Sequence, residues 1–192
     1  DYAMLLASGA LRVIHVTTHC ALMEACRLIR KERVLKVIRL ARKACEMLGI
    51  KKPRIGVAGL NPHCSENGLL GTEEASEIIP AINKAREEGI DVHGPESPDT
   101  VFVKCKAGIY DIVVAMYHDQ GHIPLKLNSF QWDAAEGKYS SVKGINTTIG
   151  LPIIRVSVDH GTAFGKAGEG RANADRMIEA VEVGLIMSEN AV

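Results

Sequence analysis

The chain has 192 residues, of which 46% are hydrophobic and only 4% aromatic, so it can bury one substantial aliphatic core, undivided or split between two lobes. Lysine and arginine together number 23, as do aspartate and glutamate, and this balance produces no long-range field that favours nucleic acid or an anionic membrane. We therefore expect small molecules or other protein subunits as partners.

Five cysteines are scattered along the sequence without a C-x-x-C pair, and an odd number cannot all pair within one chain. This usage predicts a reducing cytoplasm as the location. No apolar stretch approaches the roughly 20 residues of a membrane helix, and no signal sequence opens the chain. The chain begins at Asp1, without Met and beside an apolar segment, so we expect a region upstream of it.

The first predicted elements are two strands and a helical region. Residues 2–7 and 11–16 are apolar on both faces and are joined by a Ser-Gly turn, a pattern that predicts a hairpin, which we place at a sheet edge. Across residues 21–48 the apolar side chains recur at three- and four-residue spacing. This spacing predicts helices and allows a break near residues 31–32.

Strand and helix signals then alternate. Residues 54–59 have the pattern of a buried strand, and an irregular run follows, after which Thr72 can cap a helix that Gly89 ends. The later predicted elements are buried strands at 111–116 and 152–158 and an amphipathic helix at about 173–187.

Short apolar strands that alternate with helices predict an α/β fold with a mainly parallel sheet and helices on both faces. The sequence contains no internal repeat or low-complexity linker, so no domain boundary is drawn within residues 1–192. The most polar stretch, residues 131–143 with Trp132, predicts an exposed loop or flap.

Four histidines, His19, His63, His118 and His160, each lie shortly after the C-terminal end of a predicted strand. Open α/β sheets bind ligands along that edge. A single histidine there is more often a structural hydrogen-bonding residue than a ligand, and this alternative stays open for each of them. Four on one edge favour a shared divalent-metal site, since imidazole suits zinc, cobalt, nickel or iron.

Glycine-rich segments are candidate anion sites. In the loop at 59–71, glycines would leave backbone N–H groups free before a helix N-terminus, which suits a phosphate or dinucleotide, although a plain connector is the alternative. Residues 161–170 have the same ambiguity, and the next helix begins only later. The sequence has no G-x-G-x-x-G fingerprint, Walker phosphate loop, H-E-x-x-H helix or G-x-S-x-G elbow. Any nucleotide is therefore held by a different architecture.

Two basic residues have competing interpretations. The simplest interpretation of Lys126 and Arg155 is that they are solvated surface charges. Arg155 interrupts an apolar strand, however, and a charge in such a place usually has a partner. A carboxylate or a phosphate would be a suitable partner for Arg155.

Five motifs follow one another along most of the chain. They are G-L-N-P-H at 59–63, G-T-E-E at 71–74, A-M-Y-H-D-Q-G at 115–121, G-I-N-T-T-I-G-L-P at 144–152 and V-D-H-G-T-A at 158–163. Together they resemble the 4-hydroxythreonine-4-phosphate dehydrogenase family, and five co-linear motifs are hard to obtain by chance. The resemblance implies a fold similar to isocitrate and isopropylmalate dehydrogenases, with a cleft between two α/β lobes, and a homodimer.

The resemblance also implies the roles of individual residues. The histidines of T-T-H, G-L-N-P-H and Y-H-D-Q-G match the metal ligands, and the third ligand comes from the other subunit. His160 is not among them and has a supporting role. The implied metal ligands are His19, His63 and His118, the substrate contacts Lys126, Asn146 and Arg155, and the candidate cofactor-binding residues Gly59, Asn61, Gly68 and Gly71.

The implied reaction is oxidation of a secondary alcohol of 4-phosphohydroxy-L-threonine by NAD, followed by loss of carbon dioxide from the β-keto acid. A divalent metal (Zn, Co or Mg) would bind the alcohol and carbonyl oxygens as a Lewis acid. Lys126 and Arg155 would offset the negative charge of the substrate and orient it. No residue is assigned as general base, and no motif separates NAD from NADP.

Two departures from the family pattern leave alternatives open. The N-terminal region of the family, with its histidine-threonine substrate pair, is absent, so we expect this chain to be inactive alone. A non-catalytic metal-binding or dimerising fragment is therefore one alternative. The segment at 131–143 is longer than we expect in the biosynthetic enzyme. It resembles that of the family branch that oxidises D-threonate or D-erythronate 4-phosphate to dihydroxyacetone phosphate.

Overall fold

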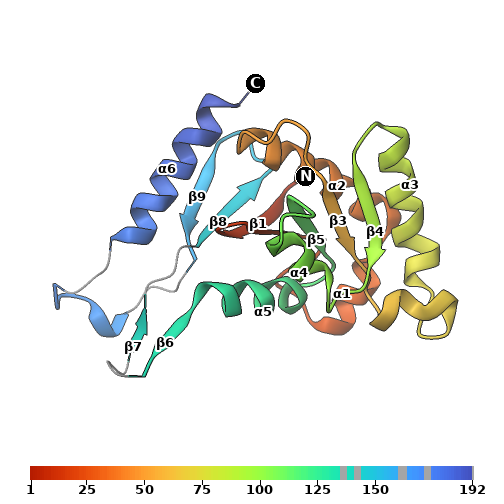
Figure 1. Cartoon of the computed structure of the whole chain (residues 1–192), viewed down its shortest axis with the longest axis horizontal. Coiled ribbons are helices and arrows are strands. Elements are labelled where there is room, and N and C mark those ends of the chain that lie inside the picture. The colour runs from red at the N-terminus through yellow and green to blue at the C-terminus, as the bar shows by residue number, and fades with distance from the viewer. Residues whose placement is uncertain (135–137, 141–143, 160–163, 171–173, 192) are drawn as a thin grey trace.

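A mixed seven-stranded sheet, in the order β4-β3-β5-β2-β1-β8-β9, runs through the centre of the molecule (Figure 1). The computed structural model describes residues 1–134, 138–140, 144–159, 164–170 and 174–191. The strands of this sheet are β1 (Ala3–Ser8), β2 (Leu11–His15), β3 (Ile55–Ala58), β4 (Val92–Glu96), β5 (Ile112–Ala115), β8 (Ile145–Ile149) and β9 (Arg155–Val158).

Six α-helices are present in the described part of the chain, together with a separate hairpin and three short turns of other helix types. The α-helices are α1 (Leu22–Leu28), α2 (Lys31–Met47), α3 (Ile79–Glu87), α4 (Val101–Lys106), α5 (His118–Ser129) and α6 (Asp175–Glu189). The hairpin pairs β6 (Gln131–Asp133) with β7 (Lys138–Ser140), and the short turns are η1 (Pro62–Gly68), η2 (Glu74–Ile78) and η3 (Phe164–Lys166).

Strand directions confirm the predicted α/β class. Strands β2, β5, β3 and β4 are parallel neighbours, whereas β1 is antiparallel to both β2 and β8, and β9 is antiparallel to β8. Strand β8 therefore points the same way as β2, so five of the seven strands share one direction. The sheet is mostly parallel in direction, with β1 and β9 reversed.

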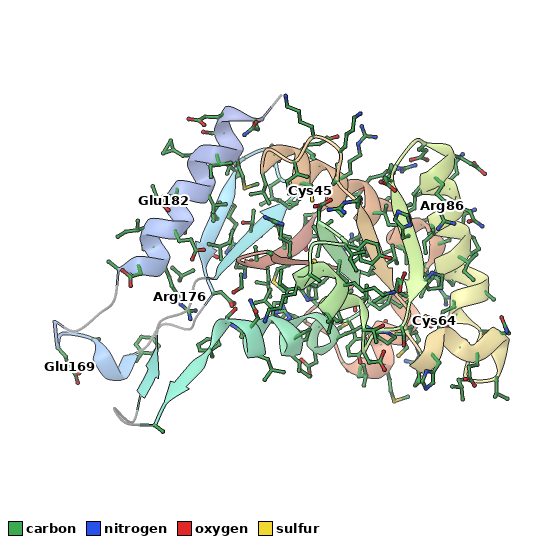
Figure 2. The ribbon with its side chains drawn as sticks, viewed as in Figure 1. Cys45, Cys64, Arg86, Glu169, Arg176 and Glu182 are labelled. Carbon is green, nitrogen blue, oxygen red and sulfur yellow. The ribbon has the colours of Figure 1, made fainter. Side chains whose placement is uncertain are left out.

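Helices cover both faces of this sheet, as the sequence predicts. On one face α2, α3 and α6 enclose the larger apolar core, which includes Leu5, Ile14, Ile38 and Val114. On the other face α4 and α5 cover a smaller cluster that includes Leu6 and Leu125. Cys45 lies on α2 inside the larger core (Figure 2), and burial raises the pKa of its thiol to about 12.

The predicted place of the first hairpin is wrong. Strands β1 and β2 form the expected antiparallel pair but lie in the middle of the sheet, and the edges are β4 and β9. The physical reason is that both strands are buried on both faces, and strands of this kind need neighbours on each side. The helical break is confirmed, since α1 ends at Leu28 and α2 begins at Lys31.

Two further local predictions need correction. Thr72 makes no capping hydrogen bond with its side chain, because the helical segment begins at Glu74 as a π-helical turn that continues into α3. The third predicted strand is shorter than 152–158 and is an edge strand with exposed Arg155 rather than a buried one. Gly89 ends the α3 region with φ of 75°, as expected.

In the part of the chain that the structure describes, no helix has both the length and the apolar character needed to cross a membrane.

Candidate functional site

Three of the predicted histidines lie beyond one edge of the parallel strands. His19 follows β2, His118 begins α5 directly after β5, and His63 lies in η1 after β3. Because β3, β5 and β2 are adjacent and parallel, their C-terminal ends meet at the same edge of the sheet. His160 lies outside the described residues.

His19 and His118 share one pocket. The centroids of their rings are 5.5 Å apart, and both line a cavity of about 510 Å³ between the start of α1 and the start of α5. Asp119 lines the same cavity. Two imidazoles around a pocket at the edge of a sheet are donors that suit a divalent transition metal, although they do not make a complete ligand set by themselves.

The hydrogen bond of His118 prepares its ring for a cation. Nδ1 of His118 lies 2.6 Å from Oδ1 of Asp119, and an ionised carboxylate can only accept, so Nδ1 carries the proton and donates. The nitrogen that can bind a metal is then Nε2. A carboxylate that holds the Nδ1–H of a metal-binding histidine is a recurrent arrangement, because it fixes both the tautomer and the ring orientation.

His63 lies in an unusual backbone segment. Residues His63–Asn67 all have positive φ, between 42° and 67°, although none of them is glycine. A left-handed conformation costs such residues about 1–2 kcal/mol each, and strain of this kind concentrates at functional sites. The side chain of His63 is exposed.

The structure brings together two of the three predicted metal ligands. Over the described ranges, no group of three or more His, Cys, Asp or Glu side chains is arranged to hold a metal ion. His63 therefore does not complete a three-ligand site with His19 and His118 within one chain. A shared site would need His63 of a partner subunit.

The carboxylate of Glu74 holds the strained loop that contains His63 through hydrogen bonds to Leu60, Asn61 and Ser65. One oxygen of its buried carboxylate accepts the backbone N–H groups of Leu60 at 2.8 Å and Asn61 at 2.7 Å. The other accepts the Asn61 side-chain amide at 2.9 Å and the hydroxyl of Ser65. Burial acts to raise the pKa of Glu74, but the hydrogen bonds from Asn61 and Ser65 outweigh it, so the pKa lies below its ordinary value.

These contacts also change the interpretation of the glycine-rich loop. The N–H of Gly59 donates to the carbonyl of Glu96 at 2.9 Å, and the N–H and side-chain amide of Asn61 both bond to Glu74. The expectation that the glycines of this stretch leave their N–H groups free is therefore wrong for Gly59, and the N–H of Asn61 is engaged as well. Binding of NAD at Gly68 and Gly71 stays a prediction, and both have positive φ.

Two of the predicted substrate contacts share one face of the sheet. Asn146 on β8 pairs with Ser157 of β9, and Arg155 pairs with Thr148, so their side chains point to the same side. Oδ1 of Asn146 is buried and has no hydrogen-bond partner among the described residues. The guanidinium of exposed Arg155 donates to the hydroxyl of Thr148 at 3.0 Å. This face is the one that α5 covers, since Leu6 beneath α5 pairs with Asn146.

Lys126 is not a solvated surface charge. Its ammonium group lies 2.7 Å from Oδ2 of Asp159 and 3.0 Å from the Asp159 carbonyl, and it also lies over the ring of Phe130. Asp159 is buried and accepts a further bond through its carbonyl from Arg176 of α6 at 3.2 Å (Figure 2). The interpretation of Lys126 as a solvated surface charge is therefore wrong, because its ammonium group has a carboxylate partner within the chain.

Two histidines that the sequence analysis does not single out lie beside His118. The ring of His122 is stacked on that of His118, with centroids 3.6 Å apart and planes 12° apart. The ring of fully buried His15 lies 4.8 Å from that of His122. Burial, and then the charge of His122, lower the pKa of His15 from 6.5 to about 3. The i to i+4 spacing of His118 and His122 is the sequence signal that could have found the pair.

Part of the predicted loop at 131–143 lies within the described residues. Within it, β6 and β7 form a hairpin that pairs residue 132 with 139 in backbone register. Residues 135–137 and 141–143 lie outside the described ranges, as do 161–163 of the second glycine-rich segment.

Comparison with known proteins identifies close relatives. The profile of the family described as "Pyridoxal phosphate biosynthetic protein PdxA" matches residues 1–184. A 4-hydroxythreonine-4-phosphate dehydrogenase from Geobacter metallireducens is 51% identical over 178 residues, 93% of this chain and 49% of the relative. A D-threonate 4-phosphate dehydrogenase from Salmonella typhimurium is 49% identical over 185 residues, 96% of this chain and 53% of the relative.

A solved structure agrees with these matches. The crystal structure of 4-hydroxythreonine-4-phosphate dehydrogenase from Klebsiella pneumoniae superposes with a TM-score of 0.81 at 46% identity, over 98% of this chain and 54% of that one. The predicted α/β fold is thereby confirmed. The chain spans about half the length of the relatives that it matches.

Proposed function

Because the chain belongs to the family of the pyridoxal phosphate biosynthetic protein PdxA, we propose that it forms part of an NAD-dependent, metal-assisted dehydrogenase. Its substrate would be a phosphorylated four-carbon hydroxy acid, which is oxidised and then decarboxylated. The observation that carries this proposal is the pocket shared by His19 and His118, in which Asp119 fixes the tautomer of His118.

We propose that His19 and His118 bind a divalent cation together with His63 of the partner subunit. When bound, Zn²⁺, Co²⁺ or Mg²⁺ would supply Lewis-acid stabilisation of negative charge on the reacting oxygens. The three-ring donor set favours Zn²⁺ or Co²⁺ over Mg²⁺, which prefers oxygen ligands. His63, on the strained η1 loop, is exposed and does not complete a three-ligand group with its own chain's pair, so it is available to a partner subunit.

Three side chains would bind and orient the substrate. Arg155 has an exposed planar guanidinium that suits a phosphate or carboxylate, and Thr148 orients it through a hydrogen bond. Oδ1 of Asn146, buried without a partner in the described structure, can accept from a substrate hydroxyl. The ammonium group of Lys126 uses two of its donors on Asp159 and has a third left for a substrate oxygen.

Two substrates are candidates. The first is 4-phosphohydroxy-L-threonine. The second, D-threonate 4-phosphate, is favoured by the name of the Salmonella typhimurium relative. Both are phosphorylated and four carbons long, and the residues proposed here would meet their shared groups.

The test measures NADH formation by the full-length protein with each substrate in the presence of Zn²⁺ or Co²⁺. We expect turnover of one substrate and a loss of at least about 100-fold in the His118→Ala variant, since a ligand is removed. The His93→Ala variant is the matched control, because His93 is an exposed histidine of β4 that pairs with Asp91. No turnover of either substrate by a folded, metal-loaded dimer would favour the alternative, a non-catalytic metal-binding or dimerising fragment.

A further inference from the structure

Three imidazole rings form a continuous column from the core to the pocket. The fully buried ring of His15 lies against His122, which in turn stacks almost parallel on His118. The column joins β2 to the first turn of α5, and its outer end is the ring that faces His19.

Hydrogen bonds fix the inner members of this column. Nδ1 of His15 donates to the carbonyl of Met4 at 3.2 Å. Nδ1 of His122 donates to the carbonyl of His118 at 2.8 Å. A ring that donates to a carbonyl through Nδ1 cannot turn about its own axis without losing that bond. His15 and His122 therefore have defined ring planes before any ligand binds.

The outer ring has less support of its own. His118 is the first residue of α5, and within the described residues its side chain forms a hydrogen bond only with Asp119, whose side chain is 70% exposed. An exposed partner restrains a ring weakly, because water competes for both groups. The stack on His122 is thus the closer of the two ring contacts of His118, with centroids 3.6 Å apart against 5.5 Å for His19.

We propose that His122 is a positioning residue, which holds the ring plane of His118 so that its Nε2 points into the pocket shared with His19. His15, which is fully buried, packs against the ring of His122 and supports it. This inference deepens the proposed function and rests on it for the identity of the ligand, but the orientation of His118 is a property of the protein without metal. Residues that orient metal ligands typically contribute about 10- to 100-fold to metal affinity.

Three substitutions separate the two contacts that His122 makes with His118, the ring stack and the hydrogen bond to its carbonyl. His122→Ala removes both the ring and the hydrogen bond to the carbonyl of His118. His122→Phe keeps a flat ring and loses the hydrogen bond, whereas His122→Asn keeps a donor and loses the ring. His93→Ala serves as the control for the loss of one histidine elsewhere. The full-length protein is used throughout.

The first readout needs no metal. In protein labelled with ¹³C-histidine, the ring protons of His118, assigned with a His118→Gln variant, are expected upfield because of the stacked neighbour. His122→Ala and His122→Asn should move them to the position of an exposed histidine, and His122→Phe should restore them. An unchanged His118 signal in His122→Ala would overturn the inference whether or not the protein binds metal.

The second readout is Co²⁺ affinity, measured by competition with a coloured chelator. We expect a loss of about 10- to 100-fold in His122→Ala and recovery to within a few fold in His122→Phe. Equal Co²⁺ affinity for His122→Ala and wild type would also overturn the inference. Wild type that binds no Co²⁺, but whose His118 signal moves as predicted, would contradict the proposed function and leave the positioning role standing.

Discussion

The carboxylate of Glu74 holds the His63 loop in a left-handed backbone conformation that is unfavourable by itself. Its four acceptor contacts tie Leu60, Asn61 and Ser65 to the start of the helical segment, while the residues after His63 stay in the left-handed region. An ionised carboxylate accepts such bonds more strongly than a neutral group does. The conformation of the His63 loop therefore depends on a side chain eleven residues away in the sequence.

Glu74→Gln should lower the free energy of unfolding by about 2–4 kcal/mol at neutral pH, because the NH₂ of a side-chain amide must replace one of two oxygens that both accept hydrogen bonds from the loop. The pKa of Glu74 is lowered in the folded state, so its contribution is complete above the unfolded value of 4.5 and is lost as the pH falls through the folded pKa. Urea unfolding from pH 7 to pH 3 should show the two proteins converging below pH 4.5.

Glu87→Gln is the matched control, because Glu87 forms only an exposed pair with Lys84 in the described structure. Its effect should stay within about 0.5 kcal/mol. A gap between wild type and Glu74→Gln that stays constant down to pH 3 would show that ionisation of Glu74 is not what holds the loop.

At the scale of elements, the start of α5 depends on a close approach to β2. A Cβ at Gly121 would lie 2.4 Å from Nε2 of His15 and 2.7 Å from Cγ1 of Val13. Real Cβ atoms do not come this close to other atoms. The two side chains that the added Cβ would meet belong to β2, a central strand. The absence of a side chain at residue 121 is what lets α5 place His118 and His122 over the sheet.

Gly121→Ala should therefore destabilise the protein by about 1–3 kcal/mol through overpacking, although alanine is the better helix former by about 1 kcal/mol. Gly184→Ala is the matched control, because it lies inside α6 with its nearest neighbour 3.8 Å from the added Cβ. That substitution should be neutral or stabilising. Thermal unfolding of both variants decides the point, and a Gly121→Ala protein as stable as Gly184→Ala would contradict it.

At the scale of the whole molecule, the separation of His63 from the other two histidines predicts complementation between subunits. Co-expressed full-length His63→Ala and His118→Ala chains should form mixed dimers with one intact site out of two. Random pairing then gives about a quarter of the wild-type activity from two inactive variants. Co-expression of His19→Ala with His118→Ala should restore nothing, because those ligands belong to the same subunit. Equal activity of the two mixtures would refute a site shared in this way.

The sequence alone determined the class of fold and most of the buried elements. Continuous apolar runs at β3 and β5 and the periodic spacing in α2 are strong local signals, because each follows from burial of that segment. The motifs also placed His19 and His118, which the structure brings into one pocket. Strands β4 and β8 and helices α4 and α5 were missed, and α5 contains both Gly121 and Pro124, which weaken any helix signal.

Only the tertiary structure decided which of these groups act on one another. The central position of the β1–β2 hairpin, the pairing of Lys126 with Asp159 and the engagement of Gly59 and Asn61 all depend on partners distant in sequence. The column of His15, His122 and His118 likewise depends on how α5 crosses β2. Periodicity records whether a residue is buried, whereas hydrogen bonds and ring contacts depend on distances that only the packing of distant elements sets.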